Sequence, residues 1–132
     1  MPNNYHLLVY QTDSDGITSL TRRLVTSYSR YFNKKYNCTG PLFEDRFKAS
    51  RISEDKYLMH ISRYIHLNPA RYNIWEFSSL PYYLGKKEAS WVVPGKVLEL
   101  FDGPKDYSRF LTDYKDYKKE LDELKYQLAN PL

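Results

Sequence analysis

Two separated segments contain side chains that together could hold a divalent metal and attack a phosphodiester. His6 lies in an alternating apolar segment, two positions after Asn4. Residues two apart in a strand share a face, so both side chains could hold one ion from the same side. Tyr64 and Asn68 are four residues apart, the spacing of neighbours on one helix face. A tyrosine hydroxyl, with a pKa of about 10, needs a metal or nearby charges to become a useful nucleophile.

The same residues also have plain structural interpretations, which the spacing alone leaves open. A single histidine on a strand is more often a hydrogen-bonded core residue than a metal ligand. Tyr64 can simply pack its ring, and Asn68 can end the helix ahead of Pro69. His60 lies one turn before Tyr64 on the same helical face, whereas His66 points away from that face and is interpreted as structural.

Basic residues concentrate in one part of the chain, residues 22–71. This range has eleven Lys and Arg against four Asp and Glu, a charge of +7, whereas the whole chain is +4. Aromatic residues are interleaved with these cations, and single-stranded nucleic acid needs both, cations for its phosphates and rings for its bases. A solvated helix face over a tyrosine-rich core would give the same composition. The candidate DNA contacts are Arg22, Arg23, Arg30, Lys34, Lys35, Arg46, Lys48 and Arg51.

Hydrophobic periodicity predicts the elements that must position these residues. Ser53 is the expected N-cap of the helix that carries Tyr64, with Glu54 and Asp55 in its first turn. The last segment repeats Tyr, Phe and Leu as an a/d seam, which either docks on its own domain or pairs with a second copy, and its shortness favours docking. The expected elements are strands over 5–11 and 47–52, helices over 17–36 and 54–67, short helices near 81–84 and 94–101, and a long helix over 107–128.

Length and composition restrict the class of protein. A chain of 132 residues suits one domain. The single cysteine, Cys38, excludes an internal disulfide and a zinc site built from several cysteines. No apolar run approaches the roughly 20 residues that span a bilayer, and no signal-peptide pattern opens the sequence. We therefore expect a reducing, cytoplasmic setting and no membrane partner.

Several motifs taken together resemble one known family. In chain order they are MPNNYHLLV at 1–9, YFN at 31–33, GPLF at 40–43, RYIHLNP at 63–69, WEFSS at 75–79 and YLG at 83–85. This combination resembles the REP-associated tyrosine transposases, which are single-tyrosine HUH nucleases, over residues 1–85. The resemblance implies an α+β fold, an antiparallel sheet with packed helices and a ferredoxin/RRM-like core that lacks its first strand and helix. Residues 86–132 would form a C-terminal helical extension packed on the same domain.

The resemblance also implies an activity and a site. Family members bind imperfect DNA hairpins and cut and rejoin single-stranded DNA through a 5′-phosphotyrosine intermediate, using Mg²⁺ or Mn²⁺. By this resemblance Tyr64 is the nucleophile, and His6, Asn68 and Asn4 hold the metal. Asn4 stands where the family has the first histidine of its pair. The alternatives are a catalytically impaired or domesticated relative that still binds hairpin DNA and, less favoured, a structural homodimer joined through the C-terminal seam.

Overall fold

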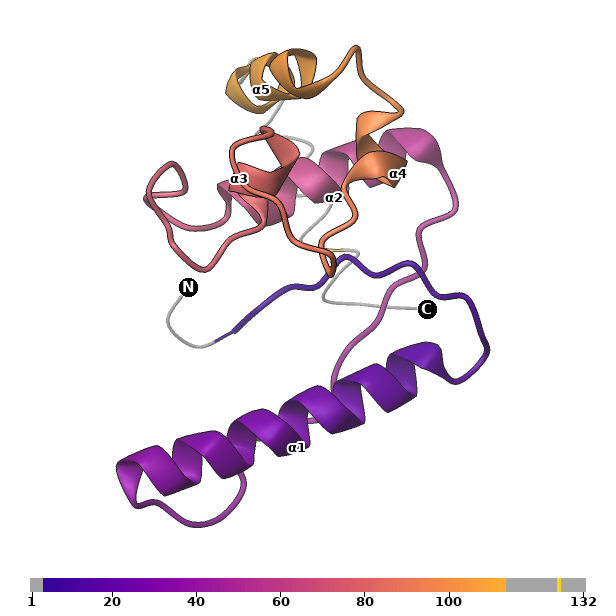
Figure 1. The fold of residues 1–132 in the computed structure, drawn as a ribbon. Coiled ribbons are helices and arrows are strands. Elements are labelled where there is room, and N and C mark those ends of the chain that lie inside the picture. Colours follow the sequence, from indigo (N-terminus) through magenta and orange to yellow (C-terminus); the bar gives the residue numbers. More distant parts are fainter. Residues whose placement is uncertain (1–3, 114–125, 127–132) are drawn as a thin grey trace. The chain divides into compact units, whose positions relative to one another are not determined.

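The computed structural model describes residues 4–113 and residue 126, and the regular elements in that part of the chain are all helices (Figure 1). The chain divides into two compact units, Leu8–Ala49, and Met1–Leu7 with Ser50–Leu132. The first unit contains α1, and the second contains the remaining described helices. In chain order the helices are α1 (Gly16–Tyr36), α2 (Asp55–Leu67), α3 (Leu80–Tyr83), α4 (Gly95–Leu98) and α5 (Pro104–Thr112).

The expected antiparallel sheet is absent from the described residues, so the predicted α+β fold is wrong. Residues 5–11 and 47–52 alternate in polarity as strands do, but neither range contains a strand residue. A strand forms only where its backbone N–H and C=O groups pair with those of a neighbouring strand. Alternating polarity shows which side chains could share a buried face. It does not show whether a neighbouring strand is present to pair with. The described part of the chain is therefore helical.

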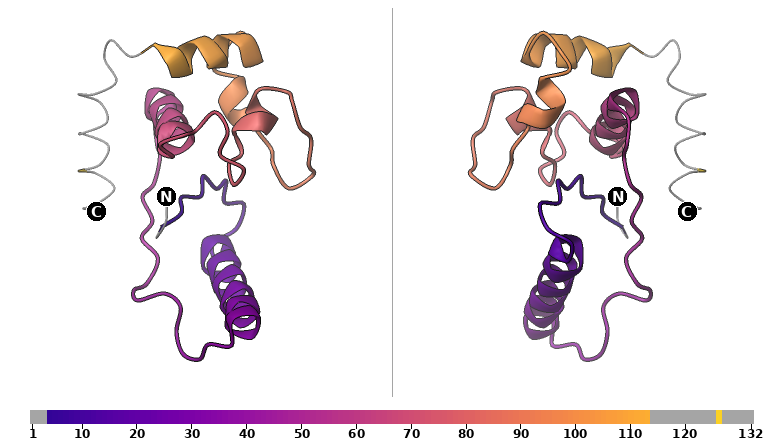
Figure 2. Two further views of the ribbon diagram at one scale, coloured as in Figure 1. Left: turned by 90° about the vertical axis from the view of Figure 1, so that its left-hand side faces the viewer. Right: turned by 90° about the vertical axis from the view of Figure 1, so that its right-hand side faces the viewer.

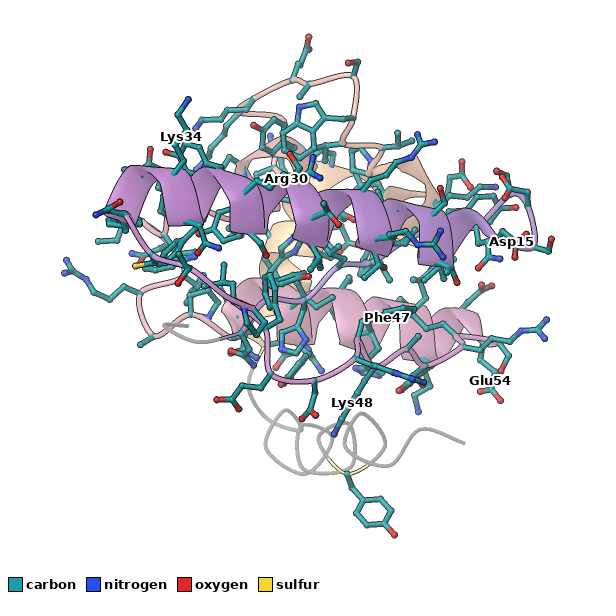
Figure 3. The ribbon with its side chains drawn as sticks, turned by 90° about the horizontal axis from the view of Figure 1, so that it is seen from below. Asp15, Arg30, Lys34, Phe47, Lys48 and Glu54 are labelled. Atoms are coloured by element: carbon teal, nitrogen blue, oxygen red, sulfur yellow. The ribbon has the colours of Figure 1, made fainter. Side chains whose placement is uncertain are left out.

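α1 extends over 21 residues, close to the bounds that its apolar spacing predicted. Asp15 precedes its first turn, and Figure 3 shows this residue at the start of the helix. After the last turn, Asn37 adopts the left-handed conformation with φ of 51°, and its N–H donates to the carbonyl of Asn33. The side-chain amide of Asn33 donates to the carbonyl of Gly40 at 3.0 Å. These two bonds end the helix and hold the chain that turns back after it.

The apolar face of α1 is less buried than the helical spacing predicted. No residue of α1 is buried, and Leu20 and Leu24 are 42% and 40% exposed. The aromatic residues of this unit contact one another instead. The ring of Tyr28 lies 6.3 Å from that of Phe32 and 6.5 Å from that of Phe43, which is on the returning segment. This unit is therefore held by a small aromatic cluster and the turn after α1.

α2 is the central helix of the second unit. It packs against α4 and α5, and Figure 2 shows this arrangement from two sides. Its N-cap is Glu54, with extended backbone, and not the predicted Ser53. Several consecutive residues in the C-terminal half of α2 are buried, so burial is not confined to one face of the helix. The buried residues of α2 are Ile61, Ser62, Arg63, Tyr64 and His66.

The other helices of this unit complete its core. α3 and α4 form at the two places where short helices were predicted. They contribute buried Leu80, Tyr83 and Val97, and α5 contributes Tyr107 and Leu111. Tyr107 is completely enclosed, with 0% exposure. Aromatic side chains thus fill much of the space beside α2, which explains part of the high tyrosine content.

The predicted long C-terminal helix over 107–128 is interrupted. α5 ends at Thr112, and Asp113 has extended backbone with ψ of 97°. The remaining seam positions, Tyr114, Tyr117, Leu121, Leu124 and Leu128, lie outside the described residues. No helix in the described ranges has the length and apolarity needed to cross a membrane.

Candidate functional site

The proposed nucleophile and one proposed metal ligand lie in contact. The rings of His6 and Tyr64 are edge to face, with centroids 5.4 Å apart and an interplanar angle of 68°. Both residues belong to the same compact unit, although 57 other residues lie between them in the sequence. Burial lowers the pKa of His6 below its usual value, so its imidazole is neutral near pH 7. A neutral imidazole is the form that binds a metal ion.

The Nε2 atom of His6 is buried and has no hydrogen-bond partner in the part of the chain that the structure describes. Buried polar atoms are nearly always paired, so an unpaired one indicates a missing partner or a functional role. A divalent cation is one such partner. The predicted role of His6 as a metal ligand stays a prediction.

The remaining predicted ligands fit less completely. Asn68 is the C-cap of α2 and keeps helical backbone angles, φ −60° and ψ −41°, so it stays one turn after Tyr64. Asn4 is exposed and is not in a strand. Across the described residues there is no group of three or more His, Cys, Asp or Glu side chains that could hold a metal. A metal here would depend on His6 together with amide oxygens, which Mg²⁺ and Mn²⁺ accept as ligands.

Arg63, immediately before Tyr64, fastens α2 to α5. Its side chain is 5% exposed, and Nη1 donates to the carbonyls of Phe110 at 3.2 Å and Asp113 at 3.3 Å. The guanidinium lies over the Phe110 ring, 4.1 Å from its centroid, and Nη2 is 3.0 Å from Nδ1 of His60. A cation suits the carbonyl end of a helix, where the dipole is negative. Arg63 is therefore a structural cation and not part of a phosphate track.

His66, two residues after Tyr64, is the centre of a buried hydrogen-bond chain. Its Nδ1 is 2.7 Å from the Tyr107 hydroxyl, and its Nε2 is 2.9 Å from Oγ of Ser79. Tyr107 donates to Oγ of Ser62, which donates to the carbonyl of Met59. With a neutral imidazole, all four bonds form together only if Nδ1 of His66 carries the proton and Nε2 accepts from Ser79. The network thus assigns one neutral tautomer, and burial lowers the pKa of His66 to about 4.

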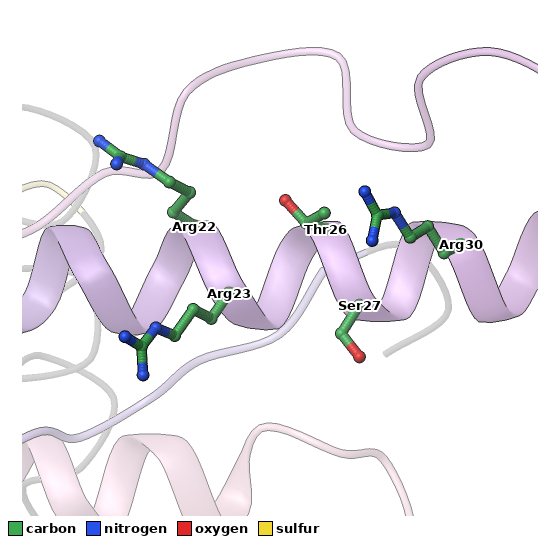
Figure 4. Close-up of a pocket in the computed structure, with 5 residues that line it drawn as sticks. All are labelled: Arg22, Arg23, Thr26, Ser27 and Arg30. Carbon is green, nitrogen blue, oxygen red and sulfur yellow. The ribbon is translucent and has the colours of Figure 1, made fainter.

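A second candidate surface lies on α1, in the other unit. Five of its residues line a shallow pocket along one side of the helix, and we call them the arginine face (Figure 4). All five side chains are exposed. Three of the predicted DNA contacts thus lie together on one rigid element. The arginine face consists of Arg22, Arg23, Thr26, Ser27 and Arg30.

The other predicted DNA contacts are dispersed. Lys34 is exposed near the end of α1 and is labelled with Arg30 in Figure 3. Lys35 lies off the arginine face, 5.5 Å and 5.4 Å from the ring centroids of Tyr31 and Tyr36. Three further residues, all exposed, follow α1 outside any helix: Arg46, Lys48 and Arg51, the last in the other unit.

No family model, no curated protein and no solved structure matches this chain.

Proposed function

We propose that this protein cleaves and rejoins single-stranded DNA beside a hairpin, as a transposase-like enzyme with Tyr64 as its nucleophile. The Tyr64 oxygen bonds to the phosphorus of the scissile phosphodiester while the bond from phosphorus to the 3′ oxygen breaks. The departing oxygen takes up a proton to become a free 3′-hydroxyl, and the tyrosine proton passes to solvent. The 5′-phosphate stays joined to Tyr64 until a second hydroxyl displaces it.

The observation that supports this proposal is the contact between His6 and Tyr64. His6 Nε2 and the amide oxygen of Asn68 would hold Mg²⁺ or Mn²⁺, with Asn4 as a further ligand, and such an ion would polarise the scissile phosphate. The bonds of Arg63 and His66 to α5 fix the backbone on either side of Tyr64. A nucleophile on a fixed backbone, beside an imidazole nitrogen with no partner among the described residues, is suited to phosphoryl transfer. The single cysteine and the DNA substrate favour a cytoplasmic location.

The second candidate function is hairpin binding without cleavage. The exposure of Asn4, which stands where the family has a histidine, favours it. In this case Tyr64 would only pack against His6, and the basic residues of α1 would carry the function.

A covalent-adduct assay separates these functions. Single-stranded DNA hairpins with flanking tails are incubated with the protein and Mn²⁺, then run on a denaturing gel. We expect a protein–DNA adduct for the wild type and none for Tyr64→Phe. Tyr57→Phe is the matched control, because it removes a hydroxyl from the same helix and should leave the adduct intact.

Asn4→His distinguishes loss of a ligand from loss of function. An adduct in this variant alone would show that the wild-type site is impaired by its missing histidine. Hairpin binding without an adduct in any variant would reject cleavage and leave the binding function.

A further inference from the structure

The charge of α1 is unusual for an exposed helix. Its 21 residues include five Lys and Arg and no Asp or Glu, so the element carries +5. Exposed helices commonly balance their cations with acidic residues three or four positions away. α1 offers its cations no such partners within the helix. The helix itself therefore does not compensate these charges.

The arginine face has a regular geometry along α1. Figure 4 shows Arg22, Thr26 and Arg30 in one row, with Arg23 and Ser27 in the adjacent row. The rise of about 1.5 Å per residue places Arg22 and Arg30 about 12 Å apart along the axis. Along the face between these two cations lie Arg23 and two hydroxyl groups, those of Thr26 and Ser27. The major groove of duplex DNA admits one helix.

We propose that the arginine face binds the double-stranded stem of the hairpin in its major groove. Arg22 and Arg30 contact backbone phosphates at two points along the groove, with Arg23 adding to the contact at one end. Thr26 and Ser27 face the base edges, where a hydroxyl can donate or accept a hydrogen bond. This inference rests on the proposed function for its substrate, a DNA hairpin. It assigns stem recognition to α1 and leaves cleavage to the unit that contains Tyr64.

An anionic membrane is the other ligand that suits a basic amphipathic helix. Such binding would require the apolar side of α1 to enter the lipid. On that side Tyr28 already contacts Phe43 of the returning segment. The arginine face carries only charged and hydroxyl side chains, which suits phosphates and base edges and does not suit an acyl layer. The observations therefore favour nucleic acid.

The test measures binding of the full chain to a fluorescent DNA hairpin by anisotropy across a series of salt concentrations. We expect Arg22→Gln and Arg30→Gln each to weaken binding and to lower the slope of log K against log salt by about one. Lys87→Gln is the matched control, because this exposed lysine lies in the other unit and should leave the affinity and slope unchanged.

Thr26→Val tests the orientation of the helix. It removes a hydroxyl but no charge, so it should alter preference among stem sequences while keeping the salt slope. Circular dichroism of each variant checks that α1 remains helical. Unchanged affinity and slope in both arginine variants would overturn the proposal. So would equal affinity for a hairpin and for a single strand of the same length that cannot pair.

Vesicles containing phosphatidylserine provide the remaining comparison. We expect them not to compete with the hairpin, and competition that the arginine variants abolish would assign the face to lipid instead. The stem and cleavage proposals fail separately. Tyr64→Phe should bind the hairpin normally. A wild-type protein that forms no adduct but keeps arginine-dependent hairpin binding contradicts cleavage alone. An adduct that forms on the hairpin as readily in both arginine variants as in the wild type, with unchanged hairpin affinity, contradicts stem recognition alone.

Discussion

His66 of α2 and Tyr107 of α5 share a buried hydrogen bond, 2.7 Å between Nδ1 and the phenolic oxygen. Arg63 joins the same two helices through the carbonyl of Phe110. Tyr64 therefore lies between two residues that are both bonded to α5. α5 lies beyond residues 1–85, the range in which the sequence resembles a transposase. The C-terminal part of the described chain thus belongs to the structural support of the candidate nucleophile.

The first prediction concerns acid stability. Burial lowers the pKa of His66 from 6.5 to about 4, so the unfolded chain binds this proton more readily than the folded one. The stabilisation is complete above pH 6.5 and is lost as the pH falls towards 4, by up to about 3 kcal/mol. Urea unfolding at pH 7 and pH 4.5 measures it. In His66→Gln the difference in unfolding free energy between the two pH values should shrink, and an equal difference in both proteins would show that other groups cause it.

The second prediction compares one substitution at two tyrosines. Tyr107→Phe removes the hydroxyl that bonds to both His66 and Ser62, and it should lower the unfolding free energy by about 1–3 kcal/mol. The Tyr57 hydroxyl is buried and has no hydrogen-bond partner among the described residues. Tyr57→Phe should therefore be neutral or stabilising, by up to about 1 kcal/mol. Thermal and urea unfolding measure both, and equal losses in the two variants would contradict the assigned network.

The third prediction concerns the bonds between Arg63 and α5. Arg63→Met keeps much of the side-chain volume but leaves the carbonyls of Phe110 and Asp113 without this donor, so we expect a loss of about 2 kcal/mol. Adduct formation should also slow, because Tyr64 is the next residue. Arg109→Met is the control, since Arg109 is exposed and its ion pair with Asp106 should contribute no more than about 0.5 kcal/mol. Comparable losses of unfolding free energy in both variants would contradict a specific role of Arg63 in joining α2 to α5.

Sequence periodicity predicted the helices well because each helix makes its backbone hydrogen bonds within itself. Both α1 and α2 began and ended near the expected residues. Strands depend on a partner elsewhere in the chain, which alternation over 5–11 and 47–52 could not reveal. The end of α5 at Thr112 was missed for a related reason, since the a/d spacing continues through Asp113 although the backbone becomes extended there.

The candidate site was predicted in part. The spacing placed Tyr64 and Asn68 on one face of a helix, and the resemblance named His6, which the fold brings against Tyr64. Spacing predicted a structural role for His66, two residues after Tyr64. The structural role of Arg63 was not predictable from spacing, because α2 buries consecutive residues and not a single stripe. Each of the two residues has a partner on α5, more than 40 residues later, and no local pattern identifies such a pair. The high basic count over 22–71 included Arg63, which the fold uses internally.

The last prediction separates ring packing from metal binding at His6. His6→Phe keeps an aromatic ring against Tyr64 and removes the buried Nε2 that has no partner among the described residues. Because this change removes a polar atom without opening a cavity, stability should stay equal or rise slightly. If Nε2 binds the metal, Mn²⁺ affinity should fall by more than about tenfold, and adduct formation should fall with it.

Manganese binding in the presence of the hairpin, followed by electron paramagnetic resonance, gives a readout independent of cleavage. Hairpin affinity serves as the control, because the arginine face of α1 is unaltered by this substitution. A His6→Phe protein that binds Mn²⁺ and forms the adduct as the wild type does would show that the ring of His6 only packs against Tyr64. Loss of both, with folding and hairpin binding intact, would make Nε2 of His6 a ligand of the catalytic metal.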